Sequence, residues 1–405
     1  MNWPDSMRAL RHPNFRLYFS GQLVSLIGTW MQNVAMSWLA YRIGNLVWLL
    51  GAITFFRQIP MLVLAPFTGV LLDHVDRLRL LRVTQALSIL PALVAALLTL
   101  SGRVQIWHLM VLTGCQGLIN AVDVPARQSL IVSLIDDREA LPNAIAMNSL
   151  AVNSARLIGP ALGGLLVALI GEGMCFLLNA ASYLAVLAAL FKVRMERPSF
   201  MSKAGFGGIR EGWAFAARTP SIRNLMLIVA VVSLLIAPYT VVMPYYARDV
   251  FHGDSRTLGL LLCASGAGAL VASAFLLSRP HVRALAAALK VCALIAAIAA
   301  MAFSHCRWFV LSSCFLVAIG FGMIVTVAAC NTLIQSIVPD RLRGRVMALF
   351  SASFIGVAPI GSLIVTGVAH WVGVPNTVLG ASLIAVLLIL RLGPGLAGVT
   401  GEVSK

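Results

Sequence analysis

Few side chains in this sequence carry a charge within apolar stretches, and those few could bind or move a charged ligand. Arg57 and Arg156 interrupt two such stretches, and Asp123 and Arg127 follow a third with a four-residue spacing. Side chains four residues apart share a helix face, so Asp123 and Arg127 can form an ion pair. The sequence has no paired carboxylates or nucleophile–histidine arrangement within reach of one site, and no Gly-x-x-x-x-Gly-Lys-Ser/Thr phosphate loop. The pattern therefore predicts ligand binding without enzymatic chemistry, bound ATP or another cofactor.

Uncharged polar and aromatic side chains lie at a similar depth to the two arginines and could line a cavity with them. The candidates are Trp30, Gln32, Asn33, Phe56, Arg57, Asn148, Asn153 and Arg156 in the first half, and Ser233, Tyr239, Thr240 and Phe354 in the second. A guanidinium at the centre of a bilayer costs roughly 2.5–3.5 kcal/mol, so each arginine should face the cavity or a partner. An anionic small molecule would complement them. The alternative, given equal weight, is that each arginine bonds helix carbonyls and glutamines such as Gln58.

The elements that position these residues are predicted from composition. Sixty per cent of the residues are hydrophobic, 11 % are charged and the mean hydropathy is +0.92, whereas a soluble domain has about 25 % charged residues. Stretches long enough to cross a bilayer, about 20 residues each, recur along the whole chain. They cover residues 17–41, 43–72, 83–102, 104–122, 141–171, 173–191, 224–247, 257–278, 284–304, 308–331, 346–371 and 372–390. The sequence therefore predicts an all-α membrane protein with twelve transmembrane helices.

A repeated loop sequence indicates that the chain consists of two similar halves. The ten residues from Ser129 align with the ten from Thr332, and five positions are identical. A repeat separated by half the chain indicates a duplicated unit, and parallel repeats of this kind occur in secondary transporters. We expect a six-helix bundle at residues 1–195, a cytoplasmic linker with a short interfacial helix at 196–220, and a second six-helix bundle at 221–405.

The formal net charge of +16 is explained by membrane topology and does not indicate a nucleic-acid partner. With both termini inside, the cytoplasmic segments hold 23 of the 30 Lys and Arg residues, as the positive-inside rule requires. Arg8, Arg11 and Arg16 precede the first apolar stretch, which is too long for a cleaved signal peptide. The seven cysteines are scattered singly, so neither a disulfide framework nor a metal site is predicted. We expect a multi-pass membrane protein with the lipid bilayer as a partner.

The loop after the second apolar stretch contains Gly69, Asp73 and Arg77 at four-residue intervals. This run resembles the Gly-x-x-x-Asp-x-x-x-Arg hallmark of the major facilitator superfamily. The resemblance implies a latch that stabilises an outward-facing state, with Arg77 paired to an acid on a neighbouring helix. Asp123 is a candidate for that acid, and a proton-carrying role for Asp123 is the less favoured alternative. The alternative to the latch is that this loop is a tight turn whose arginines follow the positive-inside rule.

A second motif, Gly159-Pro160-Ala-Leu-Gly163-Gly164, resembles the Gly-Pro-x-x-Gly-Gly motif of the superfamily's proton-coupled exporters. Proline permits a kink, and the glycines would give a flat face for packing against a helix of the other half. The segments Asp123-x-Pro125-x-Arg127, Asn143–Asn148 and Gly212–Pro220 resemble the enterobactin-exporter-like branch of bacterial efflux carriers, and the resemblance covers nearly the whole chain.

This resemblance implies a secondary active transporter that exports an amphiphilic or anionic small molecule, siderophore- or drug-like, by alternating access. The alternatives are a carrier that moves lysophospholipids or other lipids, and a non-transporting membrane sensor. The chain departs from related proton-coupled exporters, which carry an acid where it has Trp30 to Asn33, and an arginine where it has Thr113. Proton coupling would therefore depend on Asp123 or on a protonatable group of the substrate.

Overall fold

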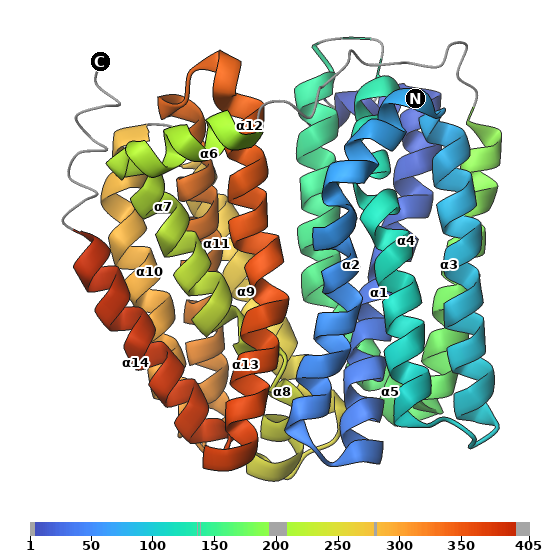
Figure 1. Cartoon of the computed structure of the whole chain (residues 1–405). Helices are drawn as coiled ribbons and strands as arrows, with labels where there is room; N and C mark the ends of the chain where they lie inside the picture. Colours follow the sequence, from blue (N-terminus) through green and yellow to red (C-terminus); the bar gives the residue numbers. More distant parts are fainter. Residues whose placement is uncertain (1–4, 136, 138, 194–208, 279–281, 394–405) are drawn as a thin grey trace. The chain divides into compact units, whose positions relative to one another are not determined.

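The computed structural model describes residues 5–135, 137, 139–193, 209–278 and 282–393, and the regular secondary structure in these ranges is helical (Figure 1). The first half forms η1 (Asp5–Arg11), α1 (Pro13–Gly44), α2 (Val47–His74), α3 (Arg77–Leu100), α4 (Ile106–Ser133) and α5 (Leu141–Lys192). The second half forms α6 (Ile209–Arg218), α7 (Pro220–Val231), η3 (Val232–Ile236), η4 (Ala237–Thr240), α8 (Met243–Tyr245), η5 (Tyr246–Val250), α9 (Ser255–Leu277), α10 (Val282–Ser304), α11 (Phe309–Ile337), α12 (Asp340–Ser351), η6 (Ala352–Gly356), α13 (Val357–Val372) and α14 (Val374–Leu392).

The number of apolar helices agrees with the number predicted from the sequence. Within the described ranges, 10 helical segments are long and apolar enough to cross a membrane. One of them is α5, whose 52 residues would extend about 78 Å as one uninterrupted helix at 1.5 Å per residue, far more than one crossing needs. The 32 residues of α1 are also long enough to cross. With α5 counted as two crossings and α1 added, the predicted twelve are reached, and the all-α membrane fold is confirmed.

The two crossings within α5 meet at Gly171. This residue has φ +80° and ψ 166°, whereas the remainder of α5 is helical. A positive φ is accessible to glycine because it lacks a Cβ atom. The sequence predicted a boundary between crossings at this position. The helix continues through Pro160, where a kink was considered.

Prolines accompany the irregular helices of the second half. The crossing from Pro220 to Val250 changes between α-, π- and 3-10-helical turns and contains Pro238 and Pro244. Proline removes the backbone donor that would bond the carbonyl four residues earlier, which favours local changes in helix type. The π-helical turn η6 likewise precedes Pro359 in α13.

Contacts divide the chain into two compact units. The first contains residues 1–44, 56–204 and 254–260, and the second contains residues 45–55, 205–253 and 261–405. The first turns of α2 thus pack with the second unit, and the first turns of α9 pack with the first.

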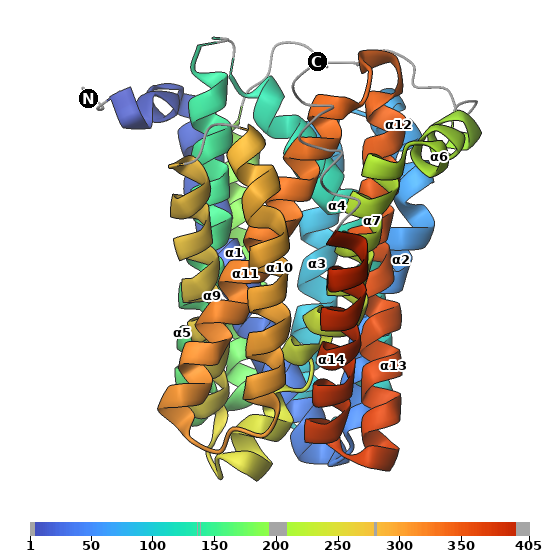
Figure 2. The ribbon, with the colours of Figure 1, turned by 90° about the vertical axis from the view of Figure 1, so that its left-hand side faces the viewer.

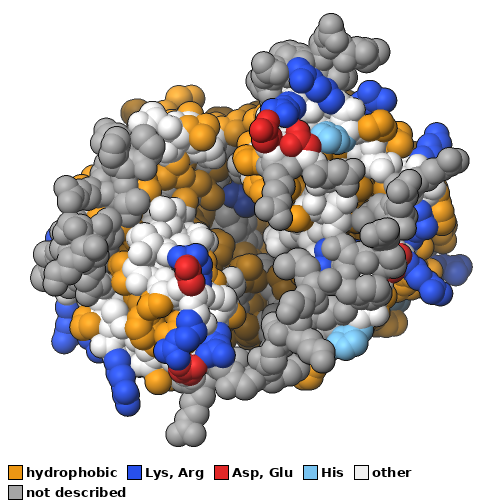
Figure 3. Space-filling model, turned by 90° about the horizontal axis from the view of Figure 1, so that it is seen from above, with side chains coloured by type: hydrophobic (Ala, Val, Ile, Leu, Met, Phe, Trp, Pro, Cys, Tyr) orange, Lys and Arg blue, Asp and Glu red, His pale blue; other side chains and the backbone are white. Residues whose placement is uncertain are grey.

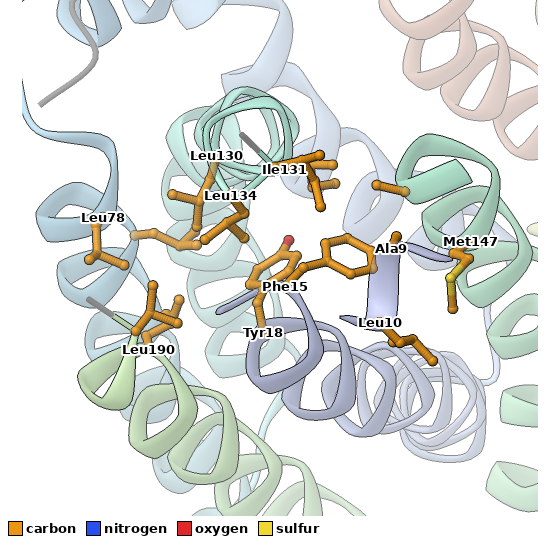
Figure 4. Close-up of a cluster of buried hydrophobic side chains, with 14 of the residues drawn as sticks. Ala9, Leu10, Phe15, Tyr18, Leu78, Leu130, Ile131, Leu134, Met147 and Leu190 are labelled. Carbon is orange, nitrogen blue, oxygen red and sulfur yellow. The ribbon is translucent and has the colours of Figure 1, made fainter. Parts of the chain in front are cut away.

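A cluster of buried apolar side chains closes one end of the first unit (Figure 4). Phe15 and Tyr18 of α1 lie beside Leu130 and Leu134 of α4, and Leu190 from the end of α5 belongs to the same cluster. Arg82 of α3 donates hydrogen bonds to the carbonyls of Leu190, at 2.9 and 3.2 Å, and of Val193. A guanidinium at a helix C-terminus satisfies carbonyls that have no helical partner, so Arg82 joins α3 to the end of α5.

In the second unit, α10 packs against both α11 and α14 (Figures 1 and 2). The contact surface of α10 is rich in alanine, and Ala293, Ala297 and Ala300 are buried. A Cβ atom on Gly322 of α11 would lie 2.8 Å from the Ala296 nitrogen. Small residues permit this close approach of helices within a membrane.

Candidate substrate site and gating residues

Two arginines and two partners from α1 form a cluster in the first unit, here called the arginine cluster: Trp30, Asn33, Arg57 and Arg156. The Arg57 Nη1 atom donates a hydrogen bond of 2.6 Å to Asn33 Oδ1. The Arg156 guanidinium lies over the Trp30 ring, 5.6 Å from its centroid. Trp30 and Asn33 are one helical turn apart, so both arginines, from α2 and α5, contact the same side of α1.

The glycines of α5 explain how Arg156 reaches Trp30. A Cβ atom on Gly159 would collide with Trp30 Cβ, and one on Gly163 would lie 2.9 Å from Met31 Cα. The backbones of α1 and α5 therefore approach closely, and Arg156, one turn before Gly159, reaches the indole ring. A cation–π contact of this kind contributes about 0.5–2 kcal/mol. All four members of the arginine cluster are half-buried, as a lining residue should be.

Gln32, which directly precedes Asn33 in α1, does not contact the arginine cluster. Gln32 is buried, and its Oε1 atom accepts a hydrogen bond of 2.6 Å from Asn179 Nδ2 in α5. It therefore belongs to the helix-packed interior of the first unit, and its expected place in the cavity wall is not supported. Asn153 lies one turn before Arg156 and is half-buried, as is Asn148, whereas Phe56 is 44 % exposed.

The candidates of the second half are held by contacts within the second unit. The Tyr239 hydroxyl shares a hydrogen bond with the Ser265 hydroxyl, and Tyr239 is buried. The Ser233 hydroxyl donates to the Phe354 carbonyl, and the Thr240 hydroxyl donates to the Ala237 carbonyl at 3.0 Å. Because these groups lie in the other unit, their role in a shared site stays a prediction.

Asp123 lies deeper in its helix than the sequence suggested. Its helix, α4, continues through Pro125 to Ser133, so Asp123 is about 15 Å from the helix end at 1.5 Å per residue. The carboxylate is 1 % exposed and accepts hydrogen bonds from Thr84 Oγ1 and Gln85 Nε2, each of 2.7 Å. It also forms the predicted ion pair with Arg127.

Among the described side chains, the expected pairing of Arg77 with an acid is not found. Arg77 is buried, and its Nη1 atom donates to Ser133 Oγ at 2.9 Å. Ser133 ends α4, whereas Asp123 lies almost three turns deeper and is occupied by Arg127, which explains the difference. The neighbouring Asp76 caps α3 by accepting hydrogen bonds from two backbone amides. The surroundings of Gly69 and the side chain of Asp73 lie outside the described part of the chain, so the latch stays a prediction.

The other side of the Gly-Pro motif packs on the start of α9. A Cβ atom on Gly164 would lie 2.9 Å from Gly259 Cα, and one on Gly259 would lie 2.6 Å from the Pro160 carbonyl oxygen. The Ser255 hydroxyl donates to the Gly164 carbonyl at 2.9 Å. Gly164 thus lies against the start of α9, whereas Gly159 and Gly163 face α1; the gating role of these glycines stays a prediction.

One buried acid escaped the sequence interpretation. Glu172 is 8 % exposed and accepts hydrogen bonds of 2.9 and 3.2 Å from the Arg42 guanidinium. In the sequence it stands between Gly171 and Gly173, where two predicted apolar stretches meet. An acid and a base at matching ends of two apolar stretches are a signal that could have predicted this ion pair.

The known proteins to which this chain is similar over almost its full length are membrane transporters. The chain is 26 % identical to the staphyloferrin A transporter of Staphylococcus aureus, over 92 % of this chain and 94 % of that protein. It is 25 % identical to the multidrug efflux pump Tap of Mycolicibacterium fortuitum, over 93 % and 94 %. It is 22 % identical to the enterobactin exporter EntS of Shigella boydii, over 96 % of each.

Solved transporters share the fold. A bacterial homologue of the iron transporter ferroportin superimposes with a TM-score of 0.69 at 18 % identity, over 94 % of this chain and 98 % of that one. The nucleoside transporter NupG superimposes with a TM-score of 0.72 at 12 % identity, over 97 % and 99 %. A family model described as a transmembrane secretion effector matches residues 5–394. The chain therefore belongs to this transmembrane secretion effector family of the major facilitator superfamily.

Proposed function

We propose that this transporter exports an amphiphilic or anionic small molecule by alternating access. The observation that carries the proposal is the arginine cluster, in which Arg57 and Arg156 lie against polar and aromatic groups of α1 and remain half-buried. Arg57 donates to the Asn33 amide oxygen and Arg156 lies over the Trp30 ring, so each guanidinium contacts an uncharged group of α1. The siderophore and drug transporters among its relatives support the same class of substrate.

A pair of fluorescent probes tests the role of charge. Anilinonaphthalene sulfonate is an anionic amphiphile, and N-phenylnaphthylamine is its neutral analogue. We expect the purified transporter to bind the anionic probe more tightly. Arg156→Gln should weaken that binding by up to about 2–5 kcal/mol, because a desolvated charge partner is lost, and should leave the neutral probe almost unaffected.

Arg103→Gln is the matched control, because Arg103 is exposed in the turn between α3 and α4 and outside the arginine cluster. It should change the binding of neither probe. If Arg156→Gln weakened both probes equally, or neither, Arg156 would be a structural tie between α1 and α5 and the preference for anions would be wrong.

The proposed location is the bacterial inner membrane, with both termini in the cytoplasm and the transporter acting as a monomer. Lys and Arg side chains predominate over Asp and Glu at the end shown in Figure 3. In the second unit, Arg341 and Arg345 of α12 at this end pair with Glu211 of α6. Reporter fusions at each terminus would test the orientation, and the mass of the detergent-solubilised protein would test the monomer.

The proposed moving parts are residues 1–195 and 221–405, joined by a linker at 196–220. Within this linker, α6 spans Ile209–Arg218, and Gly212 packs against the Arg345 side chain. Trp213 is 66 % exposed, as expected for a helix that also contacts the membrane surface.

A further inference from the structure

Three cationic side chains meet at one corner of the first unit, where α3 begins and α5 ends. Arg79 and Arg82 are three residues apart in α3 and are therefore neighbours on the surface of this helix. Lys192 is the last residue of α5. The hydrogen bonds from Arg82 to the carbonyls of Leu190 and Val193 hold the start of α3 against these last residues. We call Arg79, Arg82 and Lys192 the basic corner.

Further packing fixes the position of the basic corner. Leu78, which precedes Arg79, lies in the apolar cluster that also contains Leu190 (Figure 4). The Arg82 guanidinium lies over the Phe191 ring, 5.0 Å from its centroid. Below this corner, α3 packs along α5 (Figure 1). The junction of the two helices therefore rests on several independent contacts.

Arg82 can bind one more acceptor in this position. Its partners at the corner are two carbonyl oxygens and an aromatic ring, and the hydrogen bonds engage its Nε and Nη2 atoms. A guanidinium has five N–H donors. Among the described residues, none accepts a hydrogen bond from the Nη1 group, which therefore remains able to donate to a bound ligand.

The basic corner carries more positive than negative charge. In the described part of the chain, no carboxylate lies within ion-pair distance of its three cations. The nearby Asp76 caps α3 by accepting hydrogen bonds from backbone amides of its first turn. By contrast, Arg8 at the start of the same unit is paired with both Asp137 and Glu139. The basic corner is therefore suited to an anion from outside the protein.

An apolar track continues from the basic corner along the two helices. Val83 and Leu87 follow Arg79 at four-residue intervals on α3, which places them on the same side of the helix, and both are exposed. On the last turns of α5, Leu184 and Phe191 are exposed as well. Because α3 and α5 are crossing helices, these four side chains, here called the apolar track, contact the acyl chains of lipids.

The combination of the basic corner and the apolar track matches an anionic phospholipid. Arg and Lys side chains bind phosphate, and cationic clusters at the end of a crossing attract anionic lipids. A soluble phosphate would use the basic corner without the apolar track. A zwitterionic headgroup brings its own ammonium group, which the surrounding cations repel.

We propose that the basic corner and the apolar track bind one anionic phospholipid. Its phosphate accepts hydrogen bonds from the Arg82 Nη1 group and from the Arg79 and Lys192 side chains, and an acyl chain lies along Val83 and Leu87. The bound lipid stabilises the junction of α3 with the end of α5, shortly before the proposed linker. This site is separate from the arginine cluster, and it does not rest on the proposed transport function.

Native mass spectrometry of the purified full chain counts bound phosphatidylglycerol. We expect the wild type to retain one tightly bound lipid, and Arg79→Gln and Lys192→Gln each to weaken its binding several-fold. Both side chains are exposed, so these changes leave the fold intact. Arg16→Gln is the matched control, because Arg16 is exposed in the first turn of α1 as Arg79 is in the first turn of α3.

The control should bind phosphatidylglycerol as tightly as the wild type. An equal loss of affinity in Arg16→Gln would show that overall charge determines binding, and the proposed site would be wrong. Unchanged binding in Arg79→Gln and Lys192→Gln, or a wild type that retains no lipid, would also overturn the proposal.

Competition identifies the part of the lipid that is recognised. Phosphatidylcholine has acyl chains and a zwitterionic headgroup, whereas glycerol 3-phosphate has the phosphate without chains. We expect neither to displace phosphatidylglycerol at equal concentration. Displacement by phosphatidylcholine would contradict the preference for an anion, and displacement by glycerol 3-phosphate would contradict the role of the apolar track.

Thermal unfolding measures the stabilising effect of the lipid, because a ligand that binds the folded state raises the melting temperature. Phosphatidylglycerol should raise the melting temperature of the wild type and of Arg16→Gln by several degrees. The double variant Arg79→Gln/Lys192→Gln should lose most of this increase, and an undiminished increase would place the stabilising lipid elsewhere. Because no transport is measured, the outcome stays decisive even if the protein moved no anionic probe.

Discussion

At the scale of single residues, charged side chains within the apolar helices of the first unit are found with specific partners. Asp123 has Arg127, Thr84 and Gln85, and Glu172 has Arg42. Charges in a membrane are expensive unless paired or solvated. The positions of Asp123 and Arg127 made their pairing predictable, because i, i+4 residues share a helix face. The depth of Asp123 was not predictable, because hydropathy does not show that α4 continues to Ser133.

The ion pair of Asp123 makes a residue-scale prediction. Arg127→Leu should lower the free energy of unfolding by about 3–5 kcal/mol, because it leaves a buried carboxylate without its cation. The double variant Asp123→Asn/Arg127→Leu should lose less than the sum of the single variants. Unfolding of the purified proteins in denaturant measures both effects, and strict additivity would show that the two side chains do not interact.

At the scale of helices, composition and spacing predicted the crossings well, because about 20 apolar residues are required whatever the packing. The break at Gly171 was also predicted. The rotation of each helix about its own axis was harder to predict. Gln32 and Asn33 are adjacent, yet Gln32 bonds Asn179 of α5 whereas Asn33 bonds Arg57 of α2. Because Gln32 and Asn33 are consecutive in α1, the spacing of polar residues does not indicate which of the two points toward the cavity.

Close packing of α1 on α5 gives an element-scale prediction. Gly159→Ala should lower the melting temperature and weaken binding of anilinonaphthalene sulfonate, because the added methyl group collides with Trp30 and displaces it from Arg156. Gly114→Ala in α4 is the matched control, since an added Cβ there would meet nothing within 4 Å. That variant should be neutral or more stable, because alanine favours helix over glycine by up to about 1 kcal/mol. Equal behaviour of the two variants would contradict the packing argument.

At the scale of the whole molecule, alternating access requires contacts that stabilise one conformation and are broken when the transporter changes to the other. Two aspartates three residues apart provide a sharp comparison: Asp73 is proposed for the latch, whereas Asp76 caps α3 through the Leu78 and Arg79 amides. Asp76→Ala should therefore destabilise the fold by about 1 kcal/mol, as loss of an N-cap does. Asp73→Asn should instead reduce transport of anilinonaphthalene sulfonate in proteoliposomes, with expression and melting temperature near those of the wild type. Transport at the wild-type rate in Asp73→Asn would show that this loop is a topogenic turn and that another contact holds the closed state.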